Sequence, residues 1–275
     1  MERRFGLSMA DIACGAVERL DEEELDAIRR RLLTGEPVQY VLGEAVFCGR
    51  TFHVAPGVLI PRPETEWLCR KAVSSFMLRL HRNHPFSILD IGTGSGCIAC
   101  TIALEIPENP ENPENPESPE FPGYPESPET SPEVVAWDLS DRALDIARSN
   151  ALALGAKVKV EKQDALNPPD DVRRWEIIVS NPPYVCEHEK MAMHANVYGH
   201  EPEEALFVPD DDPLLFYRAI GSYAVRALKP GGTLLFEINP LYASELQKLL
   251  SGLGFAGVEI EADDYGKMRF ARARL

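Results

Sequence analysis

Short apolar runs alternate with longer amphipathic stretches through most of the chain. Apolar runs of a few residues are typical of buried strands, and stretches with an apolar position every three or four residues are typical of helices. Their alternation predicts an α/β fold with a doubly wound, mainly parallel sheet. The expected strands are 87–90, 134–137, 158–160, 175–179, 232–238, 257–261 and 270–274. The expected helices are 64–80, 97–105, 140–154, 213–228 and 241–253.

The first 34 residues have a helical pattern of their own. Residues 8–34 read as short helices, and Ser8 is placed to cap the first. The acidic run 21–24 lies in the first turn of the second helix, where the helix dipole favours negative charge. These features predict an N-terminal helical region over 1–34.

Glycines and prolines punctuate short alternating runs over 35–66, which predicts a β-hairpin linker. Residues 67–275 then form the α/β domain, interrupted by a Pro-Glu-x repeat over 107–133. Regular proline blocks helix and sheet, so this insert is expected to be disordered or polyproline-II-like. It joins the end of a helix to the start of a strand, away from the edge where such sheets bind ligands. We therefore favour a tolerated loop expansion over a partner-binding segment.

Charge and composition narrow the classes of function. The net charge is −16, about half of it from the insert, and this argues against a duplex-DNA binder, which normally carries a basic surface. Cys97 and Cys100 lie in an apolar helical stretch without a second ligand pair, so we interpret them as small core residues and not as a metal site. No long apolar span and no secretory signal are recognised. We expect a monomer in the cytoplasm, with an organelle matrix as the alternative.

A glycine-rich loop follows the first strand of the α/β domain. It consists of Gly92, Thr93, Gly94, Ser95 and Gly96, with Asp90 two residues before the first glycine. Glycines allow a tight turn and let a cofactor approach the backbone. The alternating G-x-G-x-G spacing differs from the dinucleotide fingerprint and resembles the S-adenosylmethionine loop of Rossmann-like methyltransferases. A glycine-rich turn without a ligand is the structural alternative.

One acidic residue ends the second strand and another follows the third. Asp138 can accept hydrogen bonds from both ribose hydroxyls of a cofactor, and the alternative role, a helix N-cap, falls more naturally to Ser140. Asp164 stands where this fold family contacts the adenine amino group, and Ala165 follows it. We therefore expect Asp138, Asp164 and Ala165 to bind the cofactor.

The fourth strand leads into the motif Asn181-Pro182-Pro183-Tyr184. Two prolines stiffen the backbone, so the Asn181 side-chain oxygen and the Pro182 carbonyl can both accept hydrogen bonds from one NH₂ group. These acceptors would orient the delocalised lone pair of an amide or exocyclic amine toward a methyl sulfonium. Tyr184 can pack on the planar group. The motif predicts methyl transfer to a planar nitrogen. No metal spacing is recognised at His188, and we interpret it as a loop residue.

The segments before and after this motif resemble those of one family. They include Gly35 to Glu44, Val58 to Glu66, Ile177 to Tyr184, Glu201-Pro202-x-x-Ala205-Leu206, Gly231 to Glu237 and Asp264-Tyr265-Gly266-x-x-Arg269. In these the chain is similar to the release-factor glutamine N5-methyltransferases of the HemK/PrmC family. The resemblance implies a mainly parallel seven-stranded sheet, S-adenosylmethionine as cofactor, and methylation of the Gly-Gly-Gln glutamine of peptide-chain release factors.

The resemblance also assigns residues. The glycine loop, Asp138 and Asn181 would contact the cofactor, and Asn181 to Tyr184 would hold the glutamine. Arg62 and Glu64 would shape the substrate channel or pair with each other, and these two alternatives stay open. Residues 1–34 would contact the release factor, although this region is shorter than in typical members. Two alternative functions are adenine methylation of DNA or RNA and a silent scaffold that binds S-adenosylmethionine.

Overall fold

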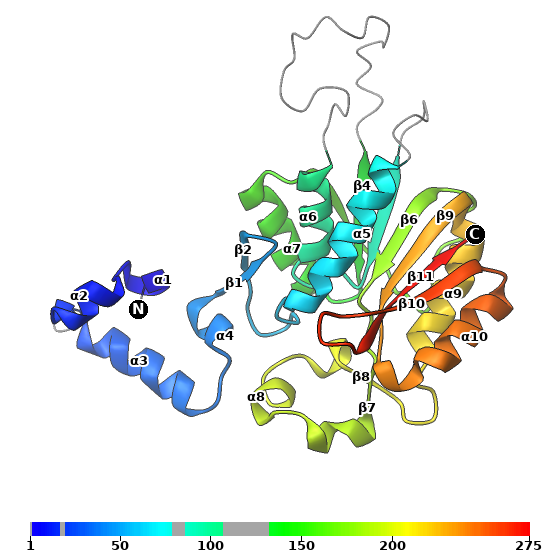
Figure 1. Ribbon diagram of the computed structural model, residues 1–275. Coiled ribbons are helices and arrows are strands. Elements are labelled where there is room, and N and C mark those ends of the chain that lie inside the picture. Colours follow the sequence, from blue (N-terminus) through cyan, green and yellow to red (C-terminus); the bar gives the residue numbers. More distant parts are fainter. Residues whose placement is uncertain (1, 17–19, 79–85, 107–131) are drawn as a thin grey trace, which may run out of the picture.

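The computed structural model describes residues 2–16, 20–78, 86–106 and 132–275. Most of them form a layered body around a twisted seven-stranded sheet (Figure 1). Its strands are β3 (Ser87–Ile91), β4 (Glu133–Asp138), β5 (Val158–Lys162), β6 (Trp175–Ser180), β9 (Leu228–Glu237), β10 (Ala256–Ala262) and β11 (Met268–Arg274). They lie in the order β10-β11-β9-β6-β3-β4-β5. The pairs among β9, β6, β3, β4 and β5 are parallel, and β11 runs antiparallel to both of its neighbours.

Helices cover both faces of the sheet. They are α5 (Glu66–Met77), α6 (Cys97–Glu105), α7 (Asp141–Leu154), α9 (Leu215–Ala227) and α10 (Ala243–Leu253). The first three pack their apolar sides on one face, where Trp67 stacks on Phe270 with ring centroids 4.3 Å apart. The last two pack on the other face, around Tyr217 and Leu250. Because both faces are covered, the central strands are apolar on both sides, which explains their continuous apolar runs.

Every strand and helix expected for the α/β domain is present, with small differences in extent. β9 begins at Leu228, four residues before its expected start, because the turn-like residues at 230–232 are accommodated by a register shift against β6. Glu133, which we assigned to the insert, is the first residue of β4 and pairs with Ser87. Residues 107–131 of the insert lie outside the described residues, as do the last two of the expected helix 64–80.

The described residues of the N-terminal region contain three α-helices, which stand apart from the sheet (Figure 1). They are α1 (Glu2–Phe5), α2 (Met9–Ala13) and α3 (Glu22–Leu33). Ser8 caps α2 as expected, and Asp21 caps α3 by accepting from the N–H groups of two glutamates in its first turn. Arg31 joins this region to the linker, since its guanidinium donates to Glu36 and, at 2.9 Å, to the carbonyl of Tyr40.

The linker contains the expected hairpin, made of β1 (Glu44–Phe47) and β2 (Arg50–His53), and a helix that we did not expect, α4 (Val38–Leu42). Buried Asn150 of α7 fastens the hairpin to that helix and to the glycine-rich loop. Its amide accepts from His53 N–H at 2.7 Å and donates to the carbonyls of His53 and Ser95. The hairpin and the glycine-rich loop are therefore held by one side chain.

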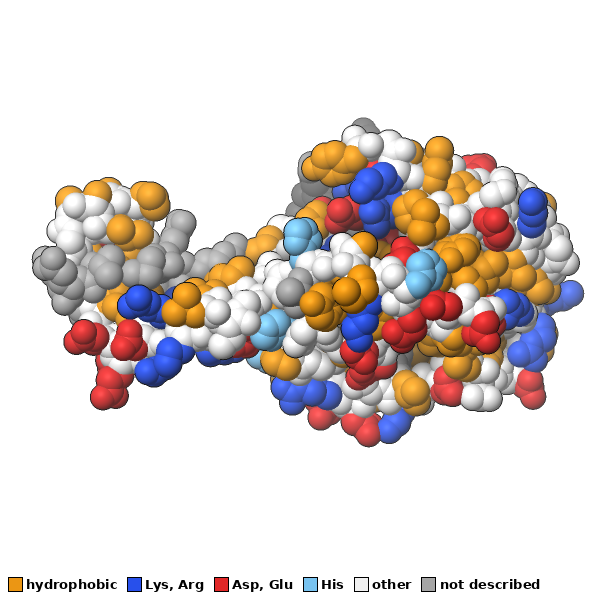
Figure 2. Space-filling model, turned by 90° about the horizontal axis from the view of Figure 1, so that it is seen from below, with side chains coloured by type: hydrophobic (Ala, Val, Ile, Leu, Met, Phe, Trp, Pro, Cys, Tyr) orange, Lys and Arg blue, Asp and Glu red, His pale blue; other side chains and the backbone are white. Residues whose placement is uncertain are grey.

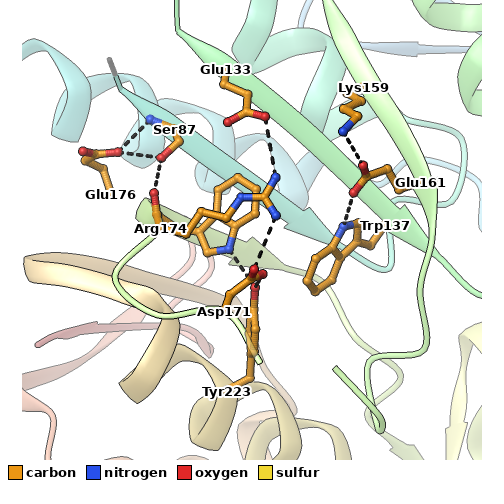
Figure 3. A network of polar contacts seen from close by, with 10 residues as sticks. Ser87, Glu133, Trp137, Lys159, Glu161, Asp171, Arg174, Glu176 and Tyr223 are labelled. Atoms are coloured by element: carbon orange, nitrogen blue, oxygen red, sulfur yellow. Dashed lines mark hydrogen bonds and ion pairs between the residues drawn. The ribbon is translucent and has the colours of Figure 1, made fainter. Parts of the chain in front are cut away.

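Polar side chains close the edge of the sheet where the parallel strands begin (Figure 3). Arg174 lies between the carboxylates of Glu133 and Asp171, 3.6 and 3.5 Å away. Ser87, at the start of β3, donates its backbone and hydroxyl hydrogens to Glu176 of β6. This network occupies the amino-terminal ends of the strands and leaves the opposite edge for a ligand.

Cys97 and Cys100 are buried in α6 and form no disulfide, which confirms that they are core residues. Burial raises the pKa of the Cys100 thiol to about 12, so the side chain packs as a neutral group. In the part of the chain that the structure describes, no helix is long and apolar enough to cross a membrane.

Candidate functional site

A cavity of about 530 Å³ opens where the parallel strands end. This volume lies in the range of small-molecule and cofactor sites. Its walls come from the glycine loop, the ends of β4 and β6, the linker and the segment that follows β6. The lining residues are Gly57, Val58, Leu59, Ile91, Gly92, Gly94, Asp138, Leu139, Ser140, Ala143, Gln163, Asp164, Ala165, Ser180, Asn181, Pro182, Pro183, Pro202, Glu204, Ala205, Phe216 and Ile220.

The glycine-rich loop divides into residues that line the cavity and residues that support it. Gly92 and Gly94 line it. Gly96 has a φ of +80°, and a Cβ there would lie 3.1 Å from that of Ala147, so the loop can sit on α7 only with glycine at this position. Thr93 donates its hydroxyl to Asp90 at 2.6 Å, and Ser95 is buried. Contact of all five loop residues with the cofactor stays a prediction.

Asp138 is held with its carboxylate at the cavity wall. One oxygen accepts from Gly94 N–H and the other from Ser140 N–H, both at 2.9 Å. Ser140 itself caps α7 through Ala143 N–H, so Asp138 is not the helix cap. Burial raises the pKa of Asp138, while the N–H donors act in the opposite direction. Each carboxylate oxygen of Asp138 keeps a lone pair that can accept from a further donor, such as a ribose hydroxyl.

Asp164 and Ala165 also line the cavity. The Asp164 carboxylate already accepts from Leu166 N–H at 2.8 Å and from the Asn167 amide at 2.6 Å. These bonds fix its orientation, and its contact with adenine stays a prediction. We did not anticipate the apolar residues Leu139 and Phe216 on the same wall. Leu139 is 60% exposed, so its apolar side chain offers free surface at the cavity.

The motif after β6 contributes Asn181, Pro182 and Pro183 to the cavity. Tyr184 is not among the lining residues. Its hydroxyl donates to Glu237 at 3.0 Å, and its ring packs against the core beside α9 and α10. Burial raises the pKa of Tyr184, so the phenol is neutral at physiological pH. Stacking of this ring on a substrate stays a prediction.

Asn181 is oriented by a residue from the linker. Its Nδ2 donates to the Thr65 hydroxyl oxygen at 3.3 Å, and Thr65 donates its own proton to Glu237 at 2.6 Å. A hydroxyl that donates to a carboxylate presents a lone pair to its other neighbour, so that neighbour must be the NH₂ side of the Asn181 amide. The Asn181 oxygen is thereby left free of Thr65. Neither Thr65 nor Glu237 was foreseen as part of the site.

Arg62 and Glu64 do not pair with each other. Arg62 donates to Glu201 at 2.5 Å, and the second oxygen of Glu201 accepts from Ile60 N–H at 2.9 Å. Glu201 is buried, so this ion pair fixes the linker against the segment that carries Pro202. Glu64 is half-buried, and neither it nor Arg62 lines the cavity. A role for either in a substrate channel stays a prediction.

Asn239, after β9, supports the same region. Its side chain donates to the Tyr184 carbonyl at 3.0 Å and to Glu189 at 2.8 Å. These hydrogen bonds hold the end of the Asn181 motif.

The fold and the cavity define a Rossmann-like methyltransferase. A family model described as methyltransferase small domain matches residues 125–200. Among solved structures, a methyltransferase from Pyrococcus furiosus is similar over 90% of this chain and 96% of its own, with a TM-score of 0.50 and 15% identity. A 16S rRNA N2 G1207 methyltransferase from T. thermophilus, in complex with AdoMet and guanosine, gives a TM-score of 0.50 at 20% identity, over 84% of this chain and 49% of its own.

More similar sequences identify the family. The release factor glutamine methyltransferase of Bacteroides thetaiotaomicron is 41% identical over 98% of this chain and 88% of its own. The release factor glutamine methyltransferase of Flavobacterium psychrophilum is 36% identical over 100% of this chain and 89% of its own. The chain belongs to the release factor glutamine methyltransferase family.

Proposed function

We propose that this protein transfers a methyl group from S-adenosylmethionine to the side-chain amide nitrogen of the Gly-Gly-Gln glutamine in peptide-chain release factors. The observation that carries the proposal is the oriented Asn181 at the cavity wall, beside Pro182 and tied to the linker by Thr65. Membership in the family supports the protein substrate over a nucleic acid.

The cofactor would occupy the cavity at the ends of the strands. Gly92 and Gly94 would lie along its methionine part, and Asp138 would accept hydrogen bonds from the ribose hydroxyls. Asp164 and Ala165 would face the adenine, with Leu139 contributing an apolar surface. The cofactor supplies an electrophilic methyl group on a positively charged sulfur.

The residues after β6 would prepare the substrate nitrogen. The Asn181 oxygen and the Pro182 carbonyl would accept its two hydrogens, so that the lone pair is directed at the methyl carbon. The cofactor would supply the methyl group and keep the electron pair of the C–S bond that is broken. The substrate nitrogen would gain positive character, which the Asn181 and Pro182 acceptors would stabilise, and would then lose one proton to water.

The partner would be a release factor that reaches the cavity past the linker. The separate N-terminal helices offer exposed apolar side chains such as Met9 and Leu33, 81% and 76% exposed, for such a contact. Basic side chains on the face in Figure 2 are interspersed with acidic ones and do not gather into one patch. This mixture favours a protein partner over duplex DNA. We still expect the protein to be a monomer in the cytoplasm.

A labelling experiment tests the proposal. A release-factor domain incubated with the protein and methyl-labelled cofactor should gain one methyl group on the Gly-Gly-Gln glutamine, located by peptide mass spectrometry. A domain with that glutamine changed to alanine is the control. Label in DNA or RNA, with none in the release factor, would favour adenine methylation. Tight cofactor binding without transfer to either would favour a silent scaffold.

A further inference from the structure

We infer that Cys186, His188 and Asp210 form a zinc site at the base of the segment that walls the cavity. Each residue offers one ligand atom, and the three atoms lie within 4.8 Å of one another. A thiolate, an imidazole nitrogen and a carboxylate oxygen are the three ligand types that zinc takes in proteins. The site lies outside the cavity and goes beyond the methyl transfer.

A small parallel ladder brings the three residues together. β7 (Val185–Cys186) pairs with β8 (Phe207–Val208), with Cys186 opposite Val208. Parallel strands end at the same edge, so the residues two positions beyond this last pair, His188 and Asp210, meet there. His188 Nδ1 lies 2.8 Å from Asp210 Oδ1, and the same oxygen accepts from His188 N–H at 3.0 Å. The backbone of the ladder thus places both residues at the same edge.

The geometry is close to what a shared ion requires. Zinc–ligand distances of about 2.0–2.3 Å place two ligand atoms of a tetrahedral site roughly 3.3–3.7 Å apart. Cys186 is buried and fixed in the ladder, whereas the side chains of His188 and Asp210 are 55% and 51% exposed and can rotate onto the ion. Three protein ligands leave the fourth position to water.

Two polar groups lie beside the Cys186 sulfur. The Cys186 sulfur accepts from Glu189 N–H, and it lies 3.4 Å from the Tyr242 hydroxyl, which can turn to donate once the thiol is deprotonated. Across the described chain, no lysine or arginine forms an ion pair with Asp210. On binding, the zinc–sulfur bond replaces the S–H bond and the proton leaves to solvent.

The position of the site assigns its role. His188 and Asp210 stand at the two ends of the segment 187–209, whose residues Pro202, Glu204 and Ala205 line the cavity. One ion bound to both ends would close this segment into a loop anchored on Cys186. The ion would thus stabilise one wall of the cavity without taking part in the transfer.

Cobalt substitution tests the inference on the full-length protein. After removal of metal with a chelator, titration with Co²⁺ should give thiolate-to-cobalt charge-transfer absorption and tetrahedral d–d bands at one ion per chain, and Zn²⁺ should abolish both. Cys186→Ser should remove the charge-transfer band, and His188→Ala should weaken binding at least about tenfold. The matched controls Cys14→Ser and His194→Ala change an exposed thiol and an exposed imidazole elsewhere and should leave the titration unchanged.

Several results would overturn the inference. These are a cobalt spectrum without a thiolate band, a spectrum that Cys186→Ser leaves intact, or binding lost in Cys14→Ser instead. Circular dichroism checks that each variant is folded. If Cys186→Ser does not fold, His188→Ala and Asp210→Asn decide, because both change half-exposed side chains; unchanged Co²⁺ affinity in both would reject the site.

Discussion

The hydroxyl oxygen of Thr65 lies 3.3 Å from the amide nitrogen of Asn181. This contact joins the two segments on which the identification depends, the linker that ends at Glu66 and the motif after β6. The linker thereby determines which way the Asn181 amide points. We propose that the linker acts on the methyl-accepting nitrogen through its contact with Asn181, in addition to any contact with the release factor.

Asn181→Ala removes one of the two proposed acceptors for the substrate amide. Because that acceptor acts on charge that develops during the transfer, we expect kcat to fall by about a hundredfold or more. Most of the affinity for S-adenosylmethionine should remain, since the other cavity residues are intact. Single-turnover rates and calorimetric titration separate the two effects. Unchanged turnover would remove Asn181 from the mechanism.

Thr65→Val keeps the shape of the side chain but cannot accept from Asn181 or donate to Glu237. The Asn181 amide can then rotate, so we expect kcat to fall about tenfold or more with little change in cofactor Kd. Thr65→Ser retains the hydroxyl and is the matched control, expected to keep most of the activity. Steady-state kinetics on both variants check this. Equal kcat for the valine and serine variants would refute the positioning role.

The sequence predicts the parts of the site that depend on neighbouring residues. It does not predict contacts between residues that are far apart in the chain. The glycine loop, Asp138 and the Asn181 motif each follow a strand directly, so local pattern and the topology of a parallel sheet place them at one edge. Thr65 is 116 residues from Asn181 and 172 from Glu237, and no local pattern reports that contact.

The same reasoning explains the elements that were missed or misjudged. Helix α4 is only five residues long, too short to show a period, and it is stabilised from outside by Arg31. The ladder of β7 and β8 has two residues in each strand. The ion pair of Arg62 with Glu201 spans 139 residues, so no local pattern could show it. Of the two alternatives left open for Arg62 and Glu64, their mutual pairing is not formed.

Asp138→Asn tests the proposed ribose contact. Asparagine has one neutral acceptor oxygen in place of two charged ones. It can therefore accept from Gly94 or from Ser140 but not from both, and it is a weaker acceptor for the ribose hydroxyls. We expect Kd for S-adenosylmethionine to rise about tenfold or more, measured by calorimetry. Asp141→Asn, a neighbouring surface carboxylate in the first turn of α7, is the control and should bind normally. Equal affinity of both variants would exclude Asp138 from cofactor binding.

The titration of buried Asp90 should make the free energy of unfolding depend on pH. It is fully buried, Oδ1 has no hydrogen-bond partner within the described chain, and burial raises its pKa to about 7. A carboxyl whose pKa is higher in the folded state stabilises the fold below its unfolded pKa near 4, and this contribution is lost as pH rises toward 7. Asp90→Asn stays neutral at every pH and can still accept from Thr93. We therefore expect the variant to gain about 2–4 kcal/mol relative to the unchanged protein between pH 4 and pH 8. Urea unfolding at both pH values measures the difference, and parallel stability profiles for the two proteins would show that Asp90 does not titrate in this range.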